Sequence, residues 1–214
     1  MSVCTTTRRA PECTVYTGPM GSGKSIEAMR WVRRRGNPEQ VVFISPTTDT
    51  RSRTWKVESR NGCTAPAIKV KVLMSLFLNL EDSQEEKEMK DKVISATAIV
   101  LDEAQFFGWA DLIAFTTKCL DDWKDVCIAG LDTDKDQKPF MPLAELHELA
   151  TRWEKLTACC KLCNDGTEAG HTIYLGDEKP IINEGGNSVL PGNKGYVAVC
   201  RKHILMHRRG ELSS

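Results

Sequence analysis

A glycine-rich stretch near the start of the chain has the residue types that hold phosphate groups. It reads GPMGSGKS from Gly18 to Ser25 and fits the pattern G-x-x-x-x-G-K-[ST], which is moderately specific by itself. Its glycines let backbone N–H groups point into one concavity, and a helix beginning at its end adds a positive pole. Lys24 can then reach the terminal phosphates, and the Ser25 hydroxyl can bind Mg²⁺. We interpret the stretch as a binding loop for a nucleoside triphosphate rather than a chance turn.

A second candidate is the acidic pair Asp102-Glu103, which directly follows the apolar run 99–101. An apolar strand that ends in acidic residues is where nucleotide-binding α/β folds keep a second group for Mg²⁺. We expect Asp102 to hold the metal through a water molecule. Glu103 could take a proton either from a substrate hydroxyl or from a water. The alternative is a pair of solvated acids at a strand end.

Four metal-ligand residues in the last quarter of the chain have the spacing of a zinc site. They form the pairs Cys160-x-x-Cys163 and Cys200-x-x-His203, separated by 36 residues. Three thiolates and one imidazole complete a tetrahedral Zn²⁺ shell, and a closed shell of this kind is structural. Cys159 is a spare thiol beside the site, and His207 is a weaker alternative ligand.

The elements that must position these residues alternate along the chain. Strands are predicted at Cys13–Thr17, Val41–Ser45, Ala98–Leu101 and Val126–Gly130, and amphipathic helices at Ser25–Arg35, Leu112–Trp123 and Leu143–Trp153. Strands that alternate with helices indicate a parallel α/β sheet. The charge-rich stretch 81–92 is expected to be a solvated helix face or a loop. Glycine, asparagine and proline become frequent after Leu156, which places a domain boundary near Lys155.

Composition narrows the class of protein. Lys+Arg and Asp+Glu number 29 each, so the net charge is zero and a nucleic-acid partner is not favoured. No apolar run approaches the ~20 residues of a membrane span, and the polar segment 1–12 does not resemble a secretory signal. We therefore expect a cytoplasmic protein, in which the nine cysteines are not paired by default.

These three motifs leave the fate of the nucleotide open. A phosphate-binding loop with an acidic pair at a strand end serves ATPases, motor proteins and kinases alike. One alternative is an ATPase that uses a zinc knuckle to act on nucleic acid, although aromatic residues are only 7% of the chain. Another alternative is a relative that binds nucleotide without catalysis. The intact set Lys24, Ser25, Asp102 and Glu103 weakens this second alternative.

Taken together, the motifs resemble those of the type II thymidine kinases. The shared segments are GPMxSGKS at 18–25, DTR at 49–51, DEAQFF at 102–107, GLDTD at 130–134, KPF at 138–140, KLTA at 155–158 and YxxVCRKH at 196–203. They occur in order over nearly the whole chain, from about Thr14 to His203, and their combination is highly specific. Five features depart from the family pattern: Gly21, Lys135, Tyr174, a long stretch at 187–195, and a histidine, His203, in place of cysteine at the end of the second zinc pair.

This resemblance implies an activity and an architecture. It implies transfer of the γ-phosphoryl group of ATP to the 5′-hydroxyl of thymidine or deoxyuridine, with Mg²⁺, in nucleotide salvage for DNA synthesis. Glu103 would be the general base. The implied fold is a P-loop (RecA-like) α/β domain at 13–155 followed by a zinc-binding lasso domain at 156–206, with flexible ends at 1–12 and 207–214. The assembly implied is a homotetramer.

The resemblance also assigns site residues. Those implied to bind ATP and Mg²⁺ are Gly18, Pro19, Met20, Gly21, Ser22, Gly23, Lys24, Ser25, Asp49, Arg51, Asp102 and Gln105. Those implied to bind the nucleoside are Met20, Phe106, Leu131, Lys135, Phe140, Ile182, Gly185, Gly186 and Tyr196. The segment between the two zinc pairs would close over the nucleoside. A zinc ion at both ends of that segment would lower the entropic penalty of ordering it.

Overall fold

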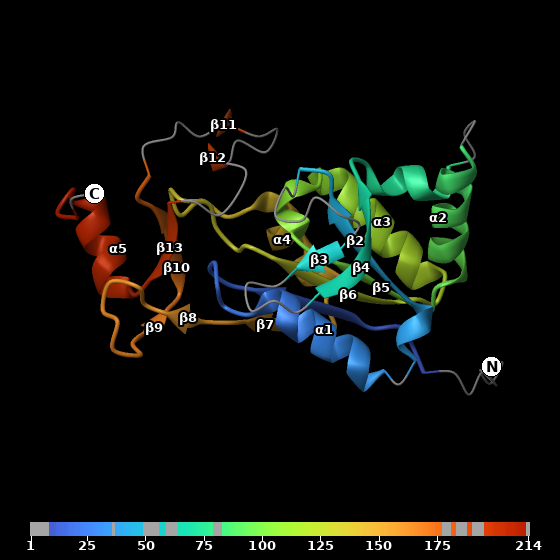
Figure 1. The fold of residues 1–214 in the computed structure, drawn as a ribbon, viewed down its shortest axis with the longest axis horizontal. Coiled ribbons are helices and arrows are strands. Elements are labelled where there is room, and N and C mark those ends of the chain that lie inside the picture. Colours follow the sequence, from blue (N-terminus) through green and yellow to red (C-terminus); the bar gives the residue numbers. More distant parts are fainter. Residues whose placement is uncertain are drawn as a thin grey trace.

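A parallel sheet forms the centre of the computed structural model (Figure 1), which describes residues 9–35, 37–48, 56–58, 64–78, 83–176, 181–182, 188–189 and 195–212. Within these residues the sheet has seven strands, in the order β3 (Lys56–Glu58), β4 (Thr64–Val70), β2 (Val41–Pro46), β5 (Ala98–Leu101), β6 (Asp125–Gly130), β1 (Cys13–Thr17) and β7 (Arg152–Lys155). Neighbouring strands run parallel except β3 and β4, which are antiparallel. The predicted α/β class is confirmed.

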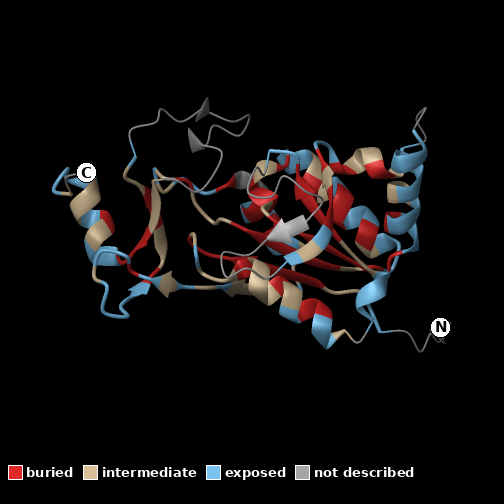
Figure 2. Ribbon diagram, viewed as in Figure 1, coloured by how far each residue is buried: buried red, intermediate tan, exposed pale blue. Residues whose placement is uncertain are grey.

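Apolar residues dominate the central strands because both faces of the sheet are covered. Every residue of β1 and β5 is buried. Successive side chains of a strand point to opposite faces, and Val15 and Tyr16 accordingly belong to two separate apolar clusters. Figure 2 shows this buried sheet between more exposed helices. A continuous apolar run is therefore the sequence pattern expected for these strands.

Helices pack on the two faces of the sheet. They are α1 (Lys24–Arg34), α2 (Gln84–Ser95), α3 (Trp109–Asp121) and α4 (Met141–Glu145), with short 3₁₀ helices η1 (Pro38–Gln40), η2 (Leu73–Phe77), η3 (Ala104–Phe106) and η4 (Leu146–Glu148). Helix α1 packs Trp31 and Val32 into the cluster that contains Tyr16. Helices α2, α3 and α4 contribute buried side chains to the cluster that contains Val15.

The charge-rich stretch 81–92 is mostly helical where the structure describes it. The side chain of Ser83 accepts a hydrogen bond from the backbone N–H of Glu86, and the Glu86 carboxylate accepts one from the backbone N–H of Ser83. This reciprocal pair satisfies two donors at the start of α2. Val93 is the buried residue of the helix. The helix therefore presents mostly charged residues to solvent. Of the two predictions from the sequence, a solvated helix face or a loop, the first is confirmed for the described residues.

One predicted helix is wrong in its second half. The stretch Leu143–Trp153 was expected to be a single amphipathic helix, but helix ends near Glu148 and β7 begins at Arg152. In β7, Trp153 pairs with Val15 of β1, and the Thr151 hydroxyl hydrogen-bonds to the backbone of Cys13. Pairing with the edge of the sheet thus overrides the helical spacing of the apolar residues.

A smaller unit follows β7. Its elements are β8 (Ala158–Cys159), β9 (Glu168–Ala169), β10 (His171–Tyr174), β11 (Ile181–Ile182), β12 (Ser188–Val189), β13 (Tyr196–Val199) and α5 (Arg201–Arg208). Each strand pair, β8–β9, β10–β13 and β11–β12, is antiparallel. An apolar cluster of its own includes Ile173, Val199 and Ile204. Figure 1 shows this unit at the end of the molecule opposite α2. Helix α5 ends at Arg208, within the segment that the sequence assigned to the C-terminal tail.

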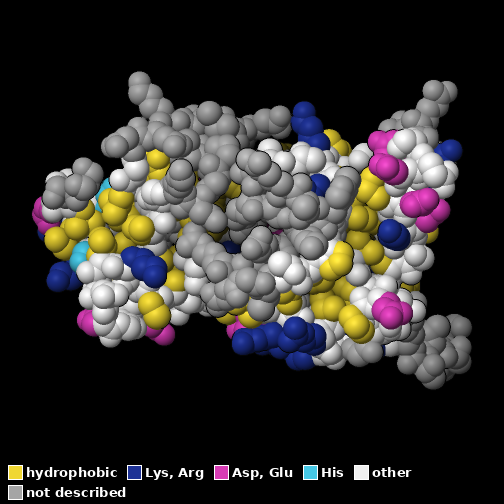
Figure 3. All heavy atoms as spheres, in the orientation of Figure 1, with side chains coloured by type: hydrophobic (Ala, Val, Ile, Leu, Met, Phe, Trp, Pro, Cys, Tyr) yellow, Lys and Arg dark blue, Asp and Glu magenta, His cyan; other side chains and the backbone are white. Residues whose placement is uncertain are grey.

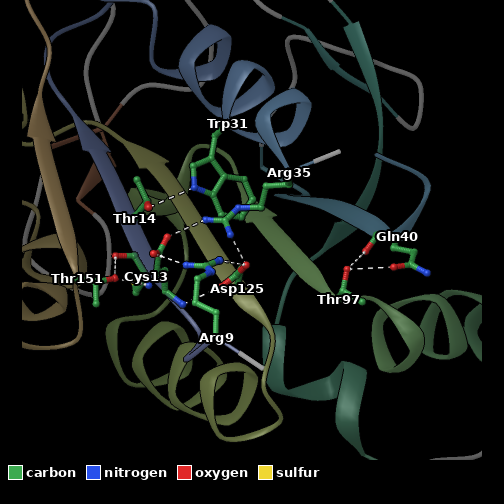
Figure 4. A network of polar contacts seen from close by, with 10 residues as sticks. Arg9, Cys13, Thr14, Trp31, Arg35, Gln40, Thr97, Asp125 and Thr151 are labelled. Carbon is green, nitrogen blue, oxygen red and sulfur yellow. Dashed lines mark hydrogen bonds and ion pairs between the residues drawn. The ribbon is translucent and has the colours of Figure 1, made fainter. Parts of the chain in front are cut away.

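A polar network joins the start of the described chain to the end of α1 (Figure 4). The Arg35 guanidinium stacks over the Trp31 ring at 4.0 Å and forms ion pairs with Asp125 and Glu12. Arg9 also pairs with both acids. The Asp125 carboxylate in addition accepts a hydrogen bond of 2.8 Å from the backbone N–H of Glu12. Asp125 therefore holds the segment before β1 against β6.

We expect Asp125→Ala to lower the free energy of unfolding by about 1–3 kcal/mol, because the guanidinium of Arg35 loses the less exposed of its two carboxylate partners and keeps only Glu12. The Arg35 and Asp125 side chains are only 18% and 17% exposed, so water replaces the lost contact poorly. Chemical denaturation measures the difference. Asp122→Ala is the matched control, because Asp122 forms a more exposed i,i+4 pair with Lys118 and should change stability by less than ~0.5 kcal/mol. Equal losses in the two variants would contradict the assignment.

Basic side chains gather on the surface over α1 in Figure 3, where Arg30, Arg33 and Arg34 are exposed. Cations near a helix C-terminus interact favourably with the helix dipole, so helix electrostatics account for two of the three. Among the described residues, no helix combines the length and apolar character needed to cross a membrane.

Candidate active site

The glycine-rich loop lies between the end of β1 and the start of α1, as the motif predicts. Gly18, Gly21 and Gly23 all have positive φ angles, of 142°, 76° and 85°. Gly23 caps α1, and its carbonyl accepts the backbone N–H of Glu27 at 2.9 Å. The loop therefore ends at the positive pole of a helix, which is the arrangement that favours bound phosphate.

Lys24 lies inside this loop. Only 8% of the residue is exposed. Its ammonium group donates hydrogen bonds to the carbonyls of Gly18 and Pro19, at 3.1 and 2.7 Å, and to the Ser22 hydroxyl at 3.3 Å. A buried ammonium group held by loop carbonyls is a fixed positive charge beside the backbone amides. The loop can thus offer charge and N–H donors to the same phosphate groups.

We expect Gly18→Ala to impair both folding and nucleotide binding. A Cβ atom at this position would lie 2.3 Å from the carbonyl oxygen of Leu156, and φ of 142° is strained for any other residue. Leu156 cannot easily move, because its N–H is hydrogen-bonded to Thr17 at 2.8 Å. The expected loss of stability is about 1–3 kcal/mol, with at least a tenfold weaker ATP affinity in titration calorimetry.

The matched control for that substitution is Gly170→Ala. A Cβ atom at Gly170 meets nothing within 4 Å, and its φ is not in the left-handed region. Gly170→Ala should leave both stability and ATP affinity near the wild-type values. If Gly18→Ala behaved in the same way, the loop would not depend on close approach of its backbone to Leu156.

The acidic pair takes two different sets of partners. The Ser25 hydroxyl lies 3.0 Å from both carboxylate oxygens of Asp102, which is only 2% exposed. The backbone N–H of Asp102 donates to the carbonyl of Ile44 on the neighbouring strand β2. A hydroxyl and a carboxylate at this distance offer hard oxygen ligands on one side of Lys24. Their chemistry fits Mg²⁺, which prefers oxygen ligands and phosphate oxygens.

Glu103 has a different neighbour from Asp102. Its backbone is left-handed, with φ of 53° and ψ of 40°, which is uncommon for a non-glycine residue. Its carboxylate accepts a hydrogen bond of 2.6 Å from the side-chain amide of Gln105. The Oε1 atom of the same amide accepts a hydrogen bond of 3.0 Å from the backbone N–H of Leu131, which follows β6. Two consecutive carboxylates at the end of β5 therefore have distinct neighbours.

Several residues predicted to bind the nucleoside lie on the segment after β6. On this segment Leu131 and Lys135 are partly exposed, whereas Phe140 is only 2% exposed. Phe106, in η3, is also partly exposed. Lys135 forms an ion pair with Asp136 at 2.7 Å. The segment folds back on itself, because the backbone N–H of Phe140 donates to Asp132 and the N–H of Asp134 donates to Lys138.

This segment is tied to the small C-terminal unit. Gln137 donates its side-chain amide to the carbonyl of Thr172 at 2.8 Å and contacts the Nδ1 atom of His171 at 2.9 Å. Burial, followed by the nearby charges of Arg201 and Lys155, lowers the pKa of His171. A lowered pKa favours the neutral ring at this contact. The predicted pocket residue Tyr196 is paired with Tyr174, their ring centroids 5.0 Å apart.

Sequence reasoning missed Thr172. Its hydroxyl accepts the backbone N–H of Met20, in the phosphate-binding loop, at 2.9 Å, and only 3% of the residue is exposed. The contact joins residues 152 positions apart in the sequence. No motif or spacing marks Thr172, since it is one β-branched residue in a short strand. The hydroxyl connects the loop to β10, a strand within the segment that is predicted to close over the nucleoside.

Some predicted residues lie outside the described part of the chain: Asp49, Arg51, Gly185 and Gly186. The backbone of Ile182 lies in the two-residue strand β11. The roles assigned to these residues stay predictions.

The four predicted zinc ligands meet in one cluster. The ligand atoms of Cys160, Cys163, Cys200 and His203 all lie within 4.8 Å of one another. The Nδ1 atom of His203 lies 3.4 to 3.6 Å from the three sulfur atoms, and two of these sulfurs are 3.7 Å apart. These separations match the edges of a tetrahedron with Zn–S bonds of about 2.3 Å. The donor set and its geometry therefore fit zinc.

The protein environment already favours a thiolate in this cluster. Burial acts to raise the pKa of Cys160, but hydrogen bonds from the backbone N–H groups of Cys163, Cys200 and Leu162 outweigh it and lower that pKa to about 6. Burial and the neighbouring thiols raise the pKa of Cys163 to about 11. Within the described residues neither the exposed Cys159 nor His207 joins the cluster, which favours His203 as the fourth ligand.

Comparison with known proteins gives two matches. The family model described as "Thymidine kinase" matches residues 12–204. A curated protein named "Thymidine kinase", from Ureaplasma urealyticum serovar 10 (strain ATCC 33699 / Western), is 32% identical over 202 residues. The alignment covers 94% of this chain and 85% of that relative. The matched region includes the phosphate-binding loop, the acidic pair and the cysteine–histidine cluster.

Proposed function

Because the chain belongs to the thymidine kinase family, we propose the following division of roles among its residues for the transfer of the γ-phosphoryl group of ATP to the 5′-hydroxyl of thymidine. The protein is an ATP-dependent kinase that phosphorylates thymidine. The observation that carries the assignment of roles is the contact of Ser25, next to Lys24 in the phosphate-binding loop, with Asp102, next to Glu103 at the carboxyl end of the sheet. Ligands of parallel α/β sheets bind at that end.

The phosphate-binding loop holds the donor. Backbone N–H groups of the loop and the start of α1 would bind the β- and γ-phosphates, and Lys24 would stabilise negative charge on the group in transfer. Ser25 and Asp102 would hold Mg²⁺. The metal, when bound, neutralises charge on the phosphate oxygens and aligns them. Asp49 and Arg51 are proposed to lie near the phosphates on the strength of the family motif.

Glu103 would act as the general base. As the 5′-hydroxyl oxygen forms its bond to the γ-phosphorus, the bond from that phosphorus to the bridging oxygen of ADP breaks. The hydroxyl proton passes to the carboxylate of Glu103. The products are thymidine 5′-monophosphate and ADP. The Gln105 amide donates a hydrogen bond of 2.6 Å to one carboxylate oxygen of Glu103, which orients the carboxylate.

The small C-terminal unit would order the nucleoside. Zinc on the cysteine–histidine cluster would join the two ends of the 36-residue segment that separates the ligand pairs. That segment would close over thymidine and exclude water, which otherwise competes with the 5′-hydroxyl for the phosphoryl group. We place Met20, Phe106, Leu131, Lys135, Phe140 and Tyr196 around the base, with Ile182, Gly185 and Gly186 beside it. We also propose a cytoplasmic homotetramer, on the family resemblance alone.

A transfer assay tests the substrate. Purified protein with Mg²⁺ and γ-labelled ATP is offered thymidine, deoxyuridine, deoxycytidine and the purine deoxynucleosides one at a time. We expect label on thymidine, or on thymidine and deoxyuridine. Label on another nucleoside only would show that Lys135 and the long stretch 187–195 have changed the pocket. ATP hydrolysis that single-stranded DNA stimulates, without label on any nucleoside, would favour the nucleic-acid ATPase instead.

A further inference from the structure

Gln105 is an internal amide with two defined partners. It lies in η3 and none of its surface is exposed. Its Nε2 atom donates to the Glu103 carboxylate at 2.6 Å, and its Oε1 atom accepts the backbone N–H of Leu131 at 3.0 Å. A flipped amide would set oxygen against carboxylate and NH₂ against N–H, two repulsive contacts. The chemistry of its neighbours therefore fixes the orientation of this amide.

The local backbone is built around this contact. The left-handed conformation of Glu103 starts a tight turn in which Phe106 donates its N–H to the carbonyl of Glu103 at 3.1 Å. The turn lets a side chain two residues later reach back to the carboxylate. At the end of β6, a Cβ atom on Gly130 would lie 2.8 Å from both Gln105 Oε1 and the Leu143 side chain. Glycine at this position leaves the space that the amide occupies.

The amide therefore links two parts of the proposed site. On one side it contacts the proposed base, and on the other it contacts the backbone of Leu131, a proposed neighbour of the thymine. The family resemblance implies that Gln105 belongs with the residues that bind ATP and Mg²⁺. Its complete burial and its two protein partners favour an indirect role instead, since both ends of the amide are engaged within the protein.

We propose that Gln105 is the positioning residue for Glu103. It holds the Glu103 carboxylate in one orientation relative to the proposed nucleoside-binding site at Leu131. This inference rests on the proposed role of Glu103 as the base. A reactant held in one orientation avoids the reorganisation that a free side chain would need before each transfer. Replacing Gln105 should therefore lower turnover by about 10–100-fold, the range found for residues that orient a functional group from behind. Gln105 itself would not touch substrate.

A double-mutant cycle tests the proposal on the full-length chain. We expect Gln105→Met to lower kcat for thymidine by about 10–100-fold while the KM for ATP changes less than about threefold. In a Glu103→Ala background, the same substitution should lower the residual kcat by less than about twofold, because the group that it positions is gone. An equal loss in both backgrounds would overturn the proposal. A tenfold rise in the KM for ATP with kcat intact would show a direct contact with the nucleotide.

A second substitution separates positioning from space filling. Gln105→Glu keeps the shape and the acceptor for Leu131 but removes the donor to Glu103. If Gln105 only fills space, Gln105→Glu should have a higher kcat than Gln105→Met. If Gln105 positions Glu103, the kcat of Gln105→Glu should be as low as that of Gln105→Met or lower. Gln40→Met, at an exposed glutamine beside Thr97, is the control for the loss of an amide and should keep wild-type kcat.

A third variant leaves Gln105 in place. It is used if the Gln105 variants do not melt cooperatively. Gly130→Ala would displace Oε1 of Gln105. We expect it to lower kcat while the KM for ATP changes little, as for Gln105→Met. Wild-type kcat in a folded Gly130→Ala chain would count against the proposal. An inactive wild-type chain would instead refute the proposed function, so the two failures are distinguishable.

Discussion

We expect Glu103→Gln to bind thymidine and ATP with nearly wild-type affinity and to lower turnover by at least about 100-fold. A positioned general base contributes ~10²–10⁴-fold, and an amide cannot accept the proton of the 5′-hydroxyl at neutral pH. The substitution conserves size, and an amide oxygen at this position can still accept the hydrogen bond that Gln105 donates. The turn after β5 is therefore retained while the proton acceptor is lost. Steady-state kinetics together with calorimetric titration of thymidine separate the two effects.

Glu148→Gln is the matched control for this prediction. Glu148 is an exposed glutamate at the end of η4. Its substitution removes one negative charge without touching the end of β5 and should leave kcat unchanged. Near-normal turnover in Glu103→Gln would move the base role to another group. A loss of thymidine affinity in that variant, with kcat intact, would make Glu103 a binding residue.

Sequence alone predicts the parts of this protein that depend on local pattern. The strands β2, β5 and β6 contain continuous apolar runs because both faces of the sheet are covered, whereas β1 was predicted as a short β-prone stretch. The bounds of all four were predicted to within a residue. The phosphate-binding loop is likewise marked by its own residues, since its glycines are needed at positive φ. The metal cluster follows from ligand spacing, because each pair of ligands is close in the chain.

The features that sequence did not predict depend on contacts between distant segments. Trp153 has the spacing of a helical residue, yet pairing with β1 makes it part of a strand. Thr172 is one hydroxyl among many until the fold brings it to Met20. The motif that contains Gln105 suggests a ligand contact, and only the arrival of Leu131 from β6 shows that both ends of its amide are occupied. Local periodicity and motifs carry no information about such partners.

We expect loss of zinc to disable nucleoside binding more than ATP binding. Cys163→Ser removes one of four clustered ligands, and structural zinc sites of this type contribute on the order of 10 kcal/mol to folding of their domain. The cluster joins the segment after β8 to the start of α5, and between them lie β10 and β13. The variant should contain well under one zinc per chain by elemental analysis. Its KM for thymidine should rise at least tenfold, whereas the KM for ATP should change less.

Cys159→Ser is a strict control, because Cys159 adjoins a ligand but is exposed and stays outside the cluster. It should retain one zinc per chain and the wild-type KM values. In Cys163→Ser, the change in the KM for thymidine is to be compared with the change in the KM for ATP. The phosphate-binding loop contacts the small unit through Thr172 and Met20, so some change in ATP binding is expected once β10 loosens. Lys24 and the start of α1, by contrast, are held by contacts within the first domain. Equal damage to both KM values would mean that zinc supports the whole fold, and unchanged zinc content would remove Cys163 from the ligand set.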